Sequence, residues 1–100
     1  MNIEVSCNSD TCTLLPEGWI DSAGAAELDQ AISENAETCE KMILDLCQVE
    51  YISSAGLRVF VAAHRRMAEK QGLFLRHVNN TVLDIISLTG FDKKLNIEKD

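Results

Sequence analysis

The chain has little basic charge and no long apolar run, and each of these two shortages excludes a class of function. Its 100 residues include 9 Lys and Arg against 16 Asp and Glu, for a net charge of −7, and only 5% are aromatic. A phosphate backbone or an anionic lipid surface repels such a chain, so we expect no binding to nucleic acid or to membrane surfaces. No segment reaches the roughly 18 consecutive apolar residues of a membrane-spanning helix, so we expect no membrane insertion.

The first residues, MNIEV, lack the basic and apolar stretches of a secretory signal, which predicts a cytoplasmic protein. Thiols stay reduced in that compartment, so all four cysteines are expected to be free: Cys7, Cys12, Cys39 and Cys47. They form no C-x-x-C pair, and neither His64 nor His77 is spaced from a cysteine as in a zinc site. The sequence therefore predicts no metal and no cofactor.

Enzyme signatures are also missing. The sequence has no glycine-rich phosphate loop, no G-x-S-x-G nucleophile elbow and no H-E-x-x-H zinc motif. His64 falls on the apolar stripe of a predicted helix and His77 alternates with Leu73 and Leu75, so both histidines are interpreted as core or boundary residues. Trp19 is likewise expected to pack within the fold. We expect a binding protein and not an enzyme, with no catalytic residue.

Strand-like and helix-like patterns alternate along the chain. Period-two or continuous apolar patterns predict strands over 3–7, 12–20, 41–47, 73–78 and, optionally, 95–97, with a brief extended stretch at 51–52. Apolar residues at helical spacing predict helices from Asp21 or Ser22 to about Asn35, from Ser53-Ser54 to a terminating Gly72, and from an N-cap at Asn80 to Gly90. This order, β-β-α-β-α-β-α with an optional last strand, predicts one α/β domain over residues 1–100. Its sheet is mixed and mostly parallel, with an N-terminal hairpin and amphipathic helices.

The segment Tyr51–Arg58 carries the most distinctive chemistry. Two hydroxyls, Ser53 and Ser54, stand where a loop enters the longest predicted helix, and the small residues Ala55 and Gly56 follow. Under one interpretation, a serine only caps the helix by accepting hydrogen bonds from its first N–H groups. Under the other, one serine caps the helix while the second is exposed for modification. A phosphate there would meet unpaired N–H donors and the positive end of the helix dipole.

The chain resembles a known family over essentially its whole length. Residues 42–59, MILDLCQVEYISSAGLRV, look like the signature region of STAS domains, and specifically of bacterial anti-sigma factor antagonists. Three further pieces resemble the family in order: Gly18-Trp19-Ile20-Asp21 before the first helix, Gly72–Leu75 as the strand after the second, and Val82–Phe91 with Leu95 as the last helix and turn. The resemblance implies the α/β STAS fold.

The resemblance also implies a phosphorylation switch. The family's acceptor is the serine directly before the small-residue–glycine–leucine group, which corresponds to Ser54. When unphosphorylated, such an antagonist binds an anti-sigma factor that is also a serine kinase, and a sigma factor is released. Phosphorylation with ATP weakens that complex, and a serine phosphatase restores it. The implied partner-binding residues are Asp21, Ser53, Ala55, Gly56, Leu57 and Arg58, and Asp45 is implied to support the strand end beneath them.

Ser53 departs from the family pattern, because many switchable members carry aspartate there. This departure makes Ser53 the second candidate for the acceptor, while the capping chemistry is preserved because both residue types cap helices well. Some members of the family are never phosphorylated, so a docking subunit of a lipid-transport or sensory complex is the alternative function. A small enzyme or nucleotide-binding module is favoured least, because the sequence has no phosphate cradle beyond a helix N-terminus.

Overall fold

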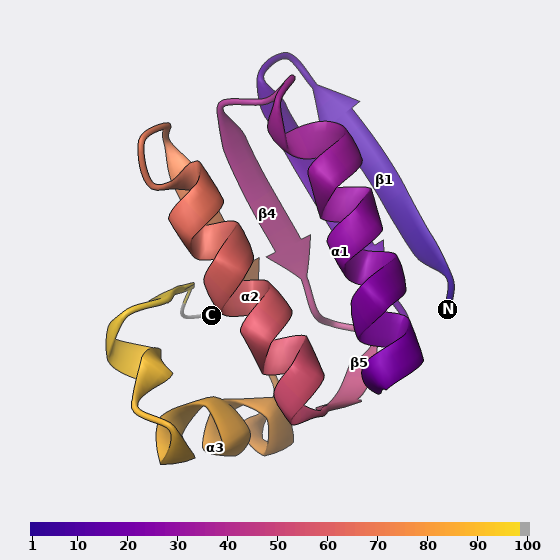
Figure 1. Cartoon of the computed structure of the whole chain (residues 1–100), viewed down its shortest axis with the longest axis vertical. Coiled ribbons are helices and arrows are strands. Elements are labelled where there is room, and N and C mark those ends of the chain that lie inside the picture. Colours follow the sequence, from indigo (N-terminus) through magenta and orange to yellow (C-terminus); the bar gives the residue numbers. More distant parts are fainter. Residues whose placement is uncertain (99–100) are drawn as a thin grey trace.

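Two helices lie side by side over a five-stranded sheet in the computed structural model, which describes residues 1–98 (Figure 1). The strands are β1 (Ile3–Asn8), β2 (Thr11–Pro16), β3 (Gly18–Ile20), β4 (Lys41–Asp45), β5 (Val49–Ile52), β6 (Gly72–Arg76) and β7 (Asn96–Ile97). The helices are α1 (Ser22–Ala36), α2 (Ser54–Met67), α3 (Asn80–Leu88) and the short 3-10 helix η1 (Phe91–Lys93).

The larger sheet has the strand order β1-β2-β4-β6-β7, and β3 and β5 form a separate parallel pair. The β1–β2 hairpin is antiparallel, whereas β2, β4, β6 and β7 run parallel to one another. The predicted α/β fold, with its N-terminal hairpin and mostly parallel mixed sheet, is therefore confirmed.

The predicted strand over 12–20 is wrong in one respect, because the chain changes sheets at Glu17. Pro16 ends β2, and the Glu17 N–H still donates to the Asn2 carbonyl (3.0 Å) beside the hairpin. The next N–H, on Gly18, donates instead to the Gln48 carbonyl (2.8 Å) beside β5. Gly18 has φ +87°, a conformation that glycine adopts without steric cost. Two short strands in different sheets therefore replace one long strand.

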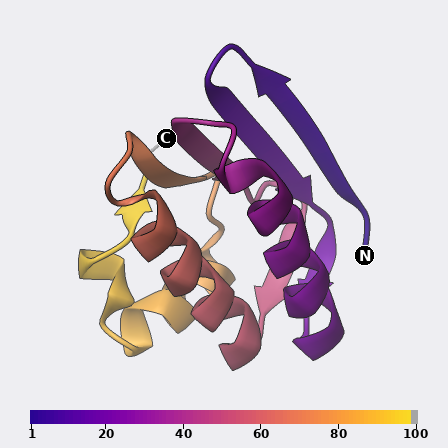
Figure 2. The same cartoon turned by 45° about the horizontal axis from the view of Figure 1, so that its top comes forward.

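The core lies between the sheet and the helices α1 and α2 (Figure 2). Its largest fully buried side chains include Leu28 and Ile32 from α1, Phe60 and Met67 from α2, and Leu44 from β4. Leu28, Ile32 and Phe60 lie on the predicted apolar stripes, because residues three, four or seven apart share one face of a helix. Met67 is buried although it is not on the predicted stripe of the second helix, and Ala68, which is on that stripe, is exposed. Within residues 1–98, no helix is long and apolar enough to span a membrane.

The ends of three elements differ from the sequence prediction. α2 ends at Met67, before the predicted stop at Gly72, which instead begins β6 with φ +108°. Asn79 rather than Asn80 caps α3, because its Oδ1 accepts from the Val82 N–H (2.8 Å). His77 lies beyond β6 with φ +56°, so it does not continue the alternation of that strand. His64 is half-buried on α2, as a boundary residue.

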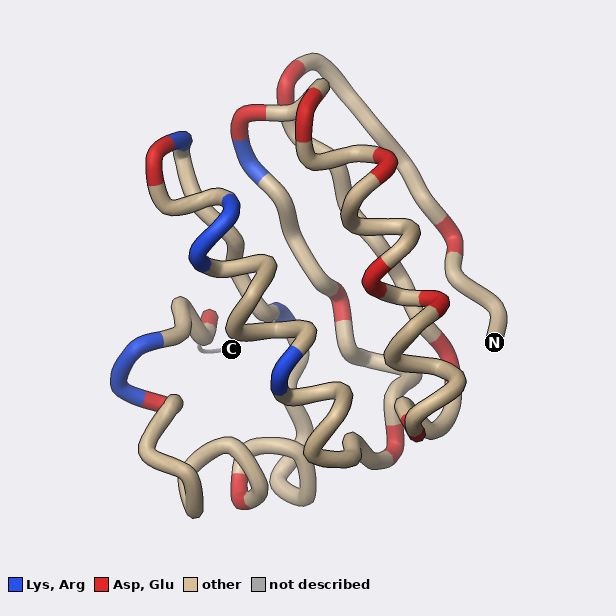
Figure 3. The backbone as a smooth tube through the Cα atoms, in the orientation of Figure 1, with Lys and Arg blue, Asp and Glu red and all other residues tan. Residues whose placement is uncertain are grey.

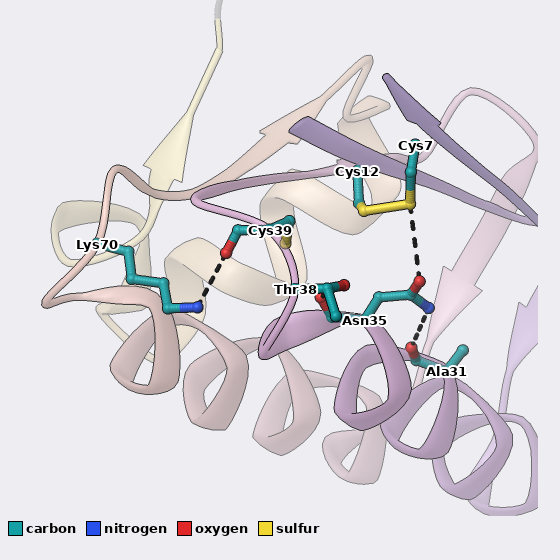
Figure 4. Close-up of a disulfide and its surroundings, with 7 residues drawn as sticks. All are labelled: Cys7, Cys12, Ala31, Asn35, Thr38, Cys39 and Lys70. Atoms are coloured by element: carbon teal, nitrogen blue, oxygen red, sulfur yellow. Dashed lines mark hydrogen bonds between the residues drawn. A yellow bond between two sulfur atoms is a disulfide. The ribbon is translucent and has the colours of Figure 1, made fainter. Parts of the chain in front are cut away.

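The prediction of four free cysteines is wrong, because Cys7 and Cys12 form a disulfide (Figure 4). They are directly opposite each other in the β1–β2 hairpin, with Cα atoms 4.1 Å apart, close to the separation of a non-hydrogen-bonded antiparallel pair. The prediction rested on the reducing conditions of the cytoplasm and not on the register of the β1–β2 hairpin, which places the two cysteines opposite each other. Cys39 and Cys47 are free, and Cys39 is buried whereas Cys47 is exposed.

We expect a thiol titration to detect the disulfide directly. The protein denatured without reductant should show two thiols per chain, from Cys39 and Cys47, and the reduced protein should show four. A Cys7→Ser/Cys12→Ser variant should show two under both conditions. Four thiols in the unreduced wild-type protein would contradict the pairing.

Lys70 holds the end of α1 against the turn that follows α2. Its Nζ donates to the carbonyls of Ala36 (2.8 Å), Cys39 (2.9 Å) and, more weakly, Glu37 (3.4 Å), and Figure 4 shows the bond to Cys39. The last carbonyls of a helix have no partner within the helix, and a cation there also interacts favourably with the helix dipole. One side chain thus satisfies acceptors that the α1 backbone leaves unpaired.

Replacing Lys70 with methionine should lower the free energy of unfolding by about 1–2 kcal/mol. Hydrogen bonds from a charged donor contribute about 1.5–3 kcal/mol, and we reduce this range because the side chain is 28% exposed. Urea denaturation followed by circular dichroism measures the change. Lys93→Met is the matched control, because Lys93 is exposed on η1 and should change stability little. Equal effects of the two substitutions would rule out a special role for Lys70.

Candidate partner-binding site

The first candidate residue, Ser53, is the N-cap of α2. Its backbone is extended (φ −86°, ψ 173°), and its Oγ accepts a hydrogen bond from the Gly56 N–H (3.2 Å). Its own N–H donates to the carbonyl of Ile20 at the end of β3 (2.9 Å). The Oγ of Ser53 therefore helps to begin the helix, and its N–H attaches the helix to the neighbouring strand.

Ser54 lies at the first position of α2 and is exposed. Its Oγ has no hydrogen-bond partner among the described residues, in contrast to the Oγ of Ser53. The first N–H groups of a helix lack partners within it and carry the positive end of the dipole. Of the two interpretations of the serine pair, the geometry therefore fits the second: one hydroxyl caps the helix and the other faces solvent.

α2 packs closely against β3 at Gly56. A Cβ atom on this buried glycine would lie 2.9 Å from Ile20 Cγ2 and 3.3 Å from the Ile20 carbonyl oxygen, so a larger side chain would push the helix away. Leu57 is only 5% exposed, and Ala55 is half-buried. Of the residues implied as partner contacts, Gly56 and Leu57 therefore mainly position the helix.

Asp21 occupies the equivalent position on the neighbouring helix. Its Oδ1 accepts from the Gly24 N–H (2.8 Å) as the N-cap of α1, and the residue is exposed. Ile20 of β3 is paired with Ile52 of β5, so the residues that follow, Asp21 and Ser53, begin two helices at the same edge of a small parallel sheet. The N-termini of α1 and α2 consequently lie at one end of the molecule (Figure 1).

An apolar groove of about 540 Å³ runs beside Ser54 along α2. Its lining residues are Ser54, Leu57, Arg58, Val61, Ala62, Arg65 and Phe91. Leu57 forms part of its floor, while Arg58 and Arg65 are exposed at its sides. Arg58, one of the residues that the family resemblance implies as partner contacts, is therefore exposed to solvent.

Charge is separated between the two helices that flank this site (Figure 3). The acidic residues of α1 include Glu27, Asp29 and Glu34, and α1 contains no Lys or Arg. α2 carries Arg58, Arg65 and Arg66, and contains no Asp or Glu. The surface around Ser54 thus has an acidic and a basic side, despite the net charge of −7.

Trp19 does not pack in the core, contrary to the prediction. Its side chain is 61% exposed, on the outer surface of the β3–β5 pair. Its ring lies 5.0 Å from that of Tyr51, and its Nε1 donates to Glu50 Oε2 (2.9 Å). The period-two pattern could have indicated this outward direction, because the adjacent Ile20 points into the core.

Asp45, predicted to support the strand end, ends β4 and holds the loop that follows. Its Oδ1 accepts from the Cys47 N–H (3.1 Å) and lies 2.9 Å from His77 Nδ1. Burial disfavours the charged form, but hydrogen bonds from His77 and Cys47 outweigh it and hold the pKa of the Asp45 carboxyl below its usual value. Burial and the hydrogen bond to Asp45 raise the pKa of the Cys47 thiol. Asp45 and Cys47 are near neighbours in the sequence, but His77 is distant from both, so residue spacing alone does not reveal this cluster.

Alanine substitution should separate the roles of the two serines. Ser53→Ala removes the cap of α2 and should lower the free energy of unfolding by about 1 kcal/mol. Ser54→Ala removes an exposed hydroxyl without a partner and should change stability by less than about 0.5 kcal/mol. Urea denaturation of the two variants measures both values. A larger loss from Ser54→Ala than from Ser53→Ala would mean that Ser54 is the cap.

Comparison with known proteins identifies relatives of this arrangement. The profile of the STAS domain family matches residues 2–100. BtrV of Bordetella bronchiseptica, named as a candidate anti-sigma factor antagonist, is 32% identical over 77 residues, which span 75% of this chain and 66% of BtrV. The crystal structure of an anti-sigma factor antagonist from Mycobacterium paratuberculosis has a TM-score of 0.89 at 25% identity, covering 99% of this chain and 86% of that one.

Two structures of SpoIIAA have the same fold as this chain. One shows the anti-sigma factor antagonist SpoIIAA in its unphosphorylated form, and the other shows the Bacillus protein in its phosphorylated form. The unphosphorylated form has a TM-score of 0.77 at 13% identity and covers 99% of this chain and 89% of that one. The phosphorylated form has a TM-score of 0.76 at 13% identity and covers 99% of this chain and 93% of that one. At that identity the likeness concerns the fold alone. Because the family profile covers residues 2–100, this chain belongs to the STAS domain family.

Proposed function

We propose that this protein is an anti-sigma factor antagonist that binds its anti-sigma factor through the surface around the N-terminus of α2, and that phosphorylation of Ser54 ends the binding. The observation that carries the proposal is the division of work between the two serines. Ser53 Oγ is used as a cap, whereas Ser54 is exposed at the start of the helix. The names of BtrV and of the Mycobacterium paratuberculosis protein support the same function.

Ser54 is a better acceptor than Ser53 on physical grounds. A kinase must bring the acceptor oxygen into line with the γ-phosphorus of ATP, and the oxygen of Ser53 is half-buried and hydrogen-bonded to the Gly56 N–H. Modification of Ser53 would remove the cap, whereas modification of Ser54 leaves it in place. Ser53 therefore remains the second choice.

The proposed docking surface consists of exposed groups from both helix N-termini. Asp21 on α1 and Arg58 on α2 supply opposite charges, and half-buried Ala55 lets a partner approach the helix. The apolar groove along α2 supplies the contact area from which water is excluded. This surface would fit an anti-sigma factor that places an apolar segment in the groove and an acidic group beside it, facing Arg58.

Phosphorylation would act by blocking this surface without refolding the domain. A phosphate adds a charge of about −1.5 to −2 at pH 7, at the edge of the groove that Ser54 lines. Arg58 lies four residues on and so shares the helix face of Ser54, and it would pair with the phosphate instead of with the partner. A loss of about 2.7 kcal/mol weakens binding about a hundredfold.

The protein itself contributes only the acceptor to the reaction. In the proposed cycle, the anti-sigma factor is also the serine kinase: it transfers the γ-phosphoryl group of ATP to Ser54 Oγ, the hydroxyl proton leaves to the kinase, and ADP is released. A serine phosphatase then hydrolyses the ester with water, which regenerates the hydroxyl and releases inorganic phosphate.

The proposal predicts that two substitutions at Ser54 affect the affinity for the anti-sigma factor differently. In calorimetric titrations with the cognate anti-sigma factor kinase, Ser54→Ala should bind as tightly as the wild-type protein and remain bound when ATP is added. The phosphorylated wild-type protein should bind at least about a hundredfold more weakly, and Ser54→Asp should show part of that loss. Mass spectrometry after incubation with kinase and ATP should locate the phosphate on Ser54.

Ser6→Asp is the charge control, because Ser6 is exposed on the distant edge strand β1 and the substitution adds the same charge. It should leave the affinity unchanged. Phosphate on Ser53 would transfer the switch to that residue. Absence of phosphate from both serines, with stable partner binding in ATP, would contradict the switch and favour a docking subunit of a lipid-transport or sensory complex.

A further inference from the structure

A cluster of carboxylate, thiol and imidazole lies at the carboxyl ends of β4 and β6, outside the proposed docking surface. Asp45 is paired with Arg76 across the two parallel strands, so Cys47 and His77 leave the sheet at the same edge. One ligand atom from each of Asp45, Cys47 and His77 lies within 4.8 Å of the others. Asp45 Oδ1 and His77 Nδ1 lie 2.9 Å apart.

The two loops that carry these side chains are held together by other groups. The Leu46 N–H donates to the Arg76 carbonyl (2.8 Å), and Asn79 Nδ2 donates to the Val49 carbonyl (2.8 Å). Neither bond uses the side chains of the cluster. These two bonds therefore join the loops independently of the cluster, and the loops present the cluster in a preformed arrangement.

The cluster has the chemistry of a metal site. The Asp45 side chain is 17% exposed, and that of His77 is 47% exposed, so the carboxylate is shielded while the imidazole borders solvent. His77 has φ +56°, which is uncommon for a residue other than glycine, and its Nδ1 lies beside the Asp45 carboxylate. Thiolate, imidazole and carboxylate together are ligands that suit zinc, whereas magnesium and calcium favour oxygen ligands alone.

We propose that Asp45, Cys47 and His77 bind a zinc ion. On binding, zinc replaces the thiol proton of Cys47, which leaves to solvent, and the carboxylate and one imidazole nitrogen complete three protein ligands. Tetrahedral zinc takes four ligands, so water or a side chain of a docked protein supplies the fourth. The ion joins the loop before β5 to the loop before α3.

Cobalt(II) titration tests the site, because cobalt occupies zinc sites and reports its ligands by absorption. The unreduced wild-type protein, with its Cys7–Cys12 disulfide intact, should bind one Co²⁺ per chain, with a thiolate-to-cobalt charge-transfer band in the near ultraviolet, and Zn²⁺ should displace it. Cys47→Ser should abolish that band. It should also weaken Zn²⁺ binding by about a hundredfold or more, because loss of a supporting group alone costs about 10–100-fold. Asp45→Asn and His77→Ala should each weaken binding by at least about tenfold.

The chain offers a matched control for two of the proposed ligands. Cys39→Ser removes the other free cysteine, which is buried, and His64→Gln removes the other histidine; both variants should keep the band and the affinity. Circular dichroism of each variant without metal verifies that it is folded. The proposal is overturned if millimolar Co²⁺ produces no charge-transfer band, or if the band persists in folded Cys47→Ser. Equal binding by folded His77→Ala and wild-type protein would also overturn it.

Discussion

The contact between α2 and the last residue of β3 determines the geometry of the site. The Ile20 carbonyl accepts the Ser53 N–H, and the Ile20 side chain leaves no room for a Cβ atom on Gly56. These two constraints set where α2 begins and how closely it approaches the small sheet. With the start of the helix fixed, the Ser53 hydroxyl faces the Gly56 N–H, and the next hydroxyl, on Ser54, faces solvent.

Local charge and net charge describe different properties of this chain. The net charge of −7 governs long-range repulsion from polyanions. Near the proposed docking surface, however, charges on the two helices matter more, because solvent screens exposed charges beyond about 8–10 Å. α2 is basic along its length and α1 is acidic (Figure 3). A partner that contacts both helices must place acidic groups against α2 and basic groups against α1, and this charge complementarity determines its orientation.

The sequence predicted the features that depend on neighbouring residues, and missed those that depend on strand register. The starts of α1 and α2 were predicted to within one residue, at Asp21 or Ser22 and at Ser53 or Ser54, because caps and apolar periodicity are local signals. The pairing of Cys47 with His77 was missed because 30 residues separate them, and only the alignment of β4 with β6 brings them together. The Cys7–Cys12 pair was within reach, since the hairpin register places them opposite each other.

In the proposed switch, separate residues serve as helix cap and phosphate acceptor, so that the surface would change its charge while the domain stays folded. If the modified residue were also the cap, each phosphorylation would remove a helix-starting hydrogen bond worth about 1 kcal/mol. A domain of this size is stabilised by only about 5–15 kcal/mol in all, so repeated modification would alter both folding and binding. Ser53 keeps the hydrogen bond to Gly56 whatever is attached to Ser54. Either serine or aspartate at position 53 would preserve this division, because both side chains offer an oxygen acceptor to the same N–H group.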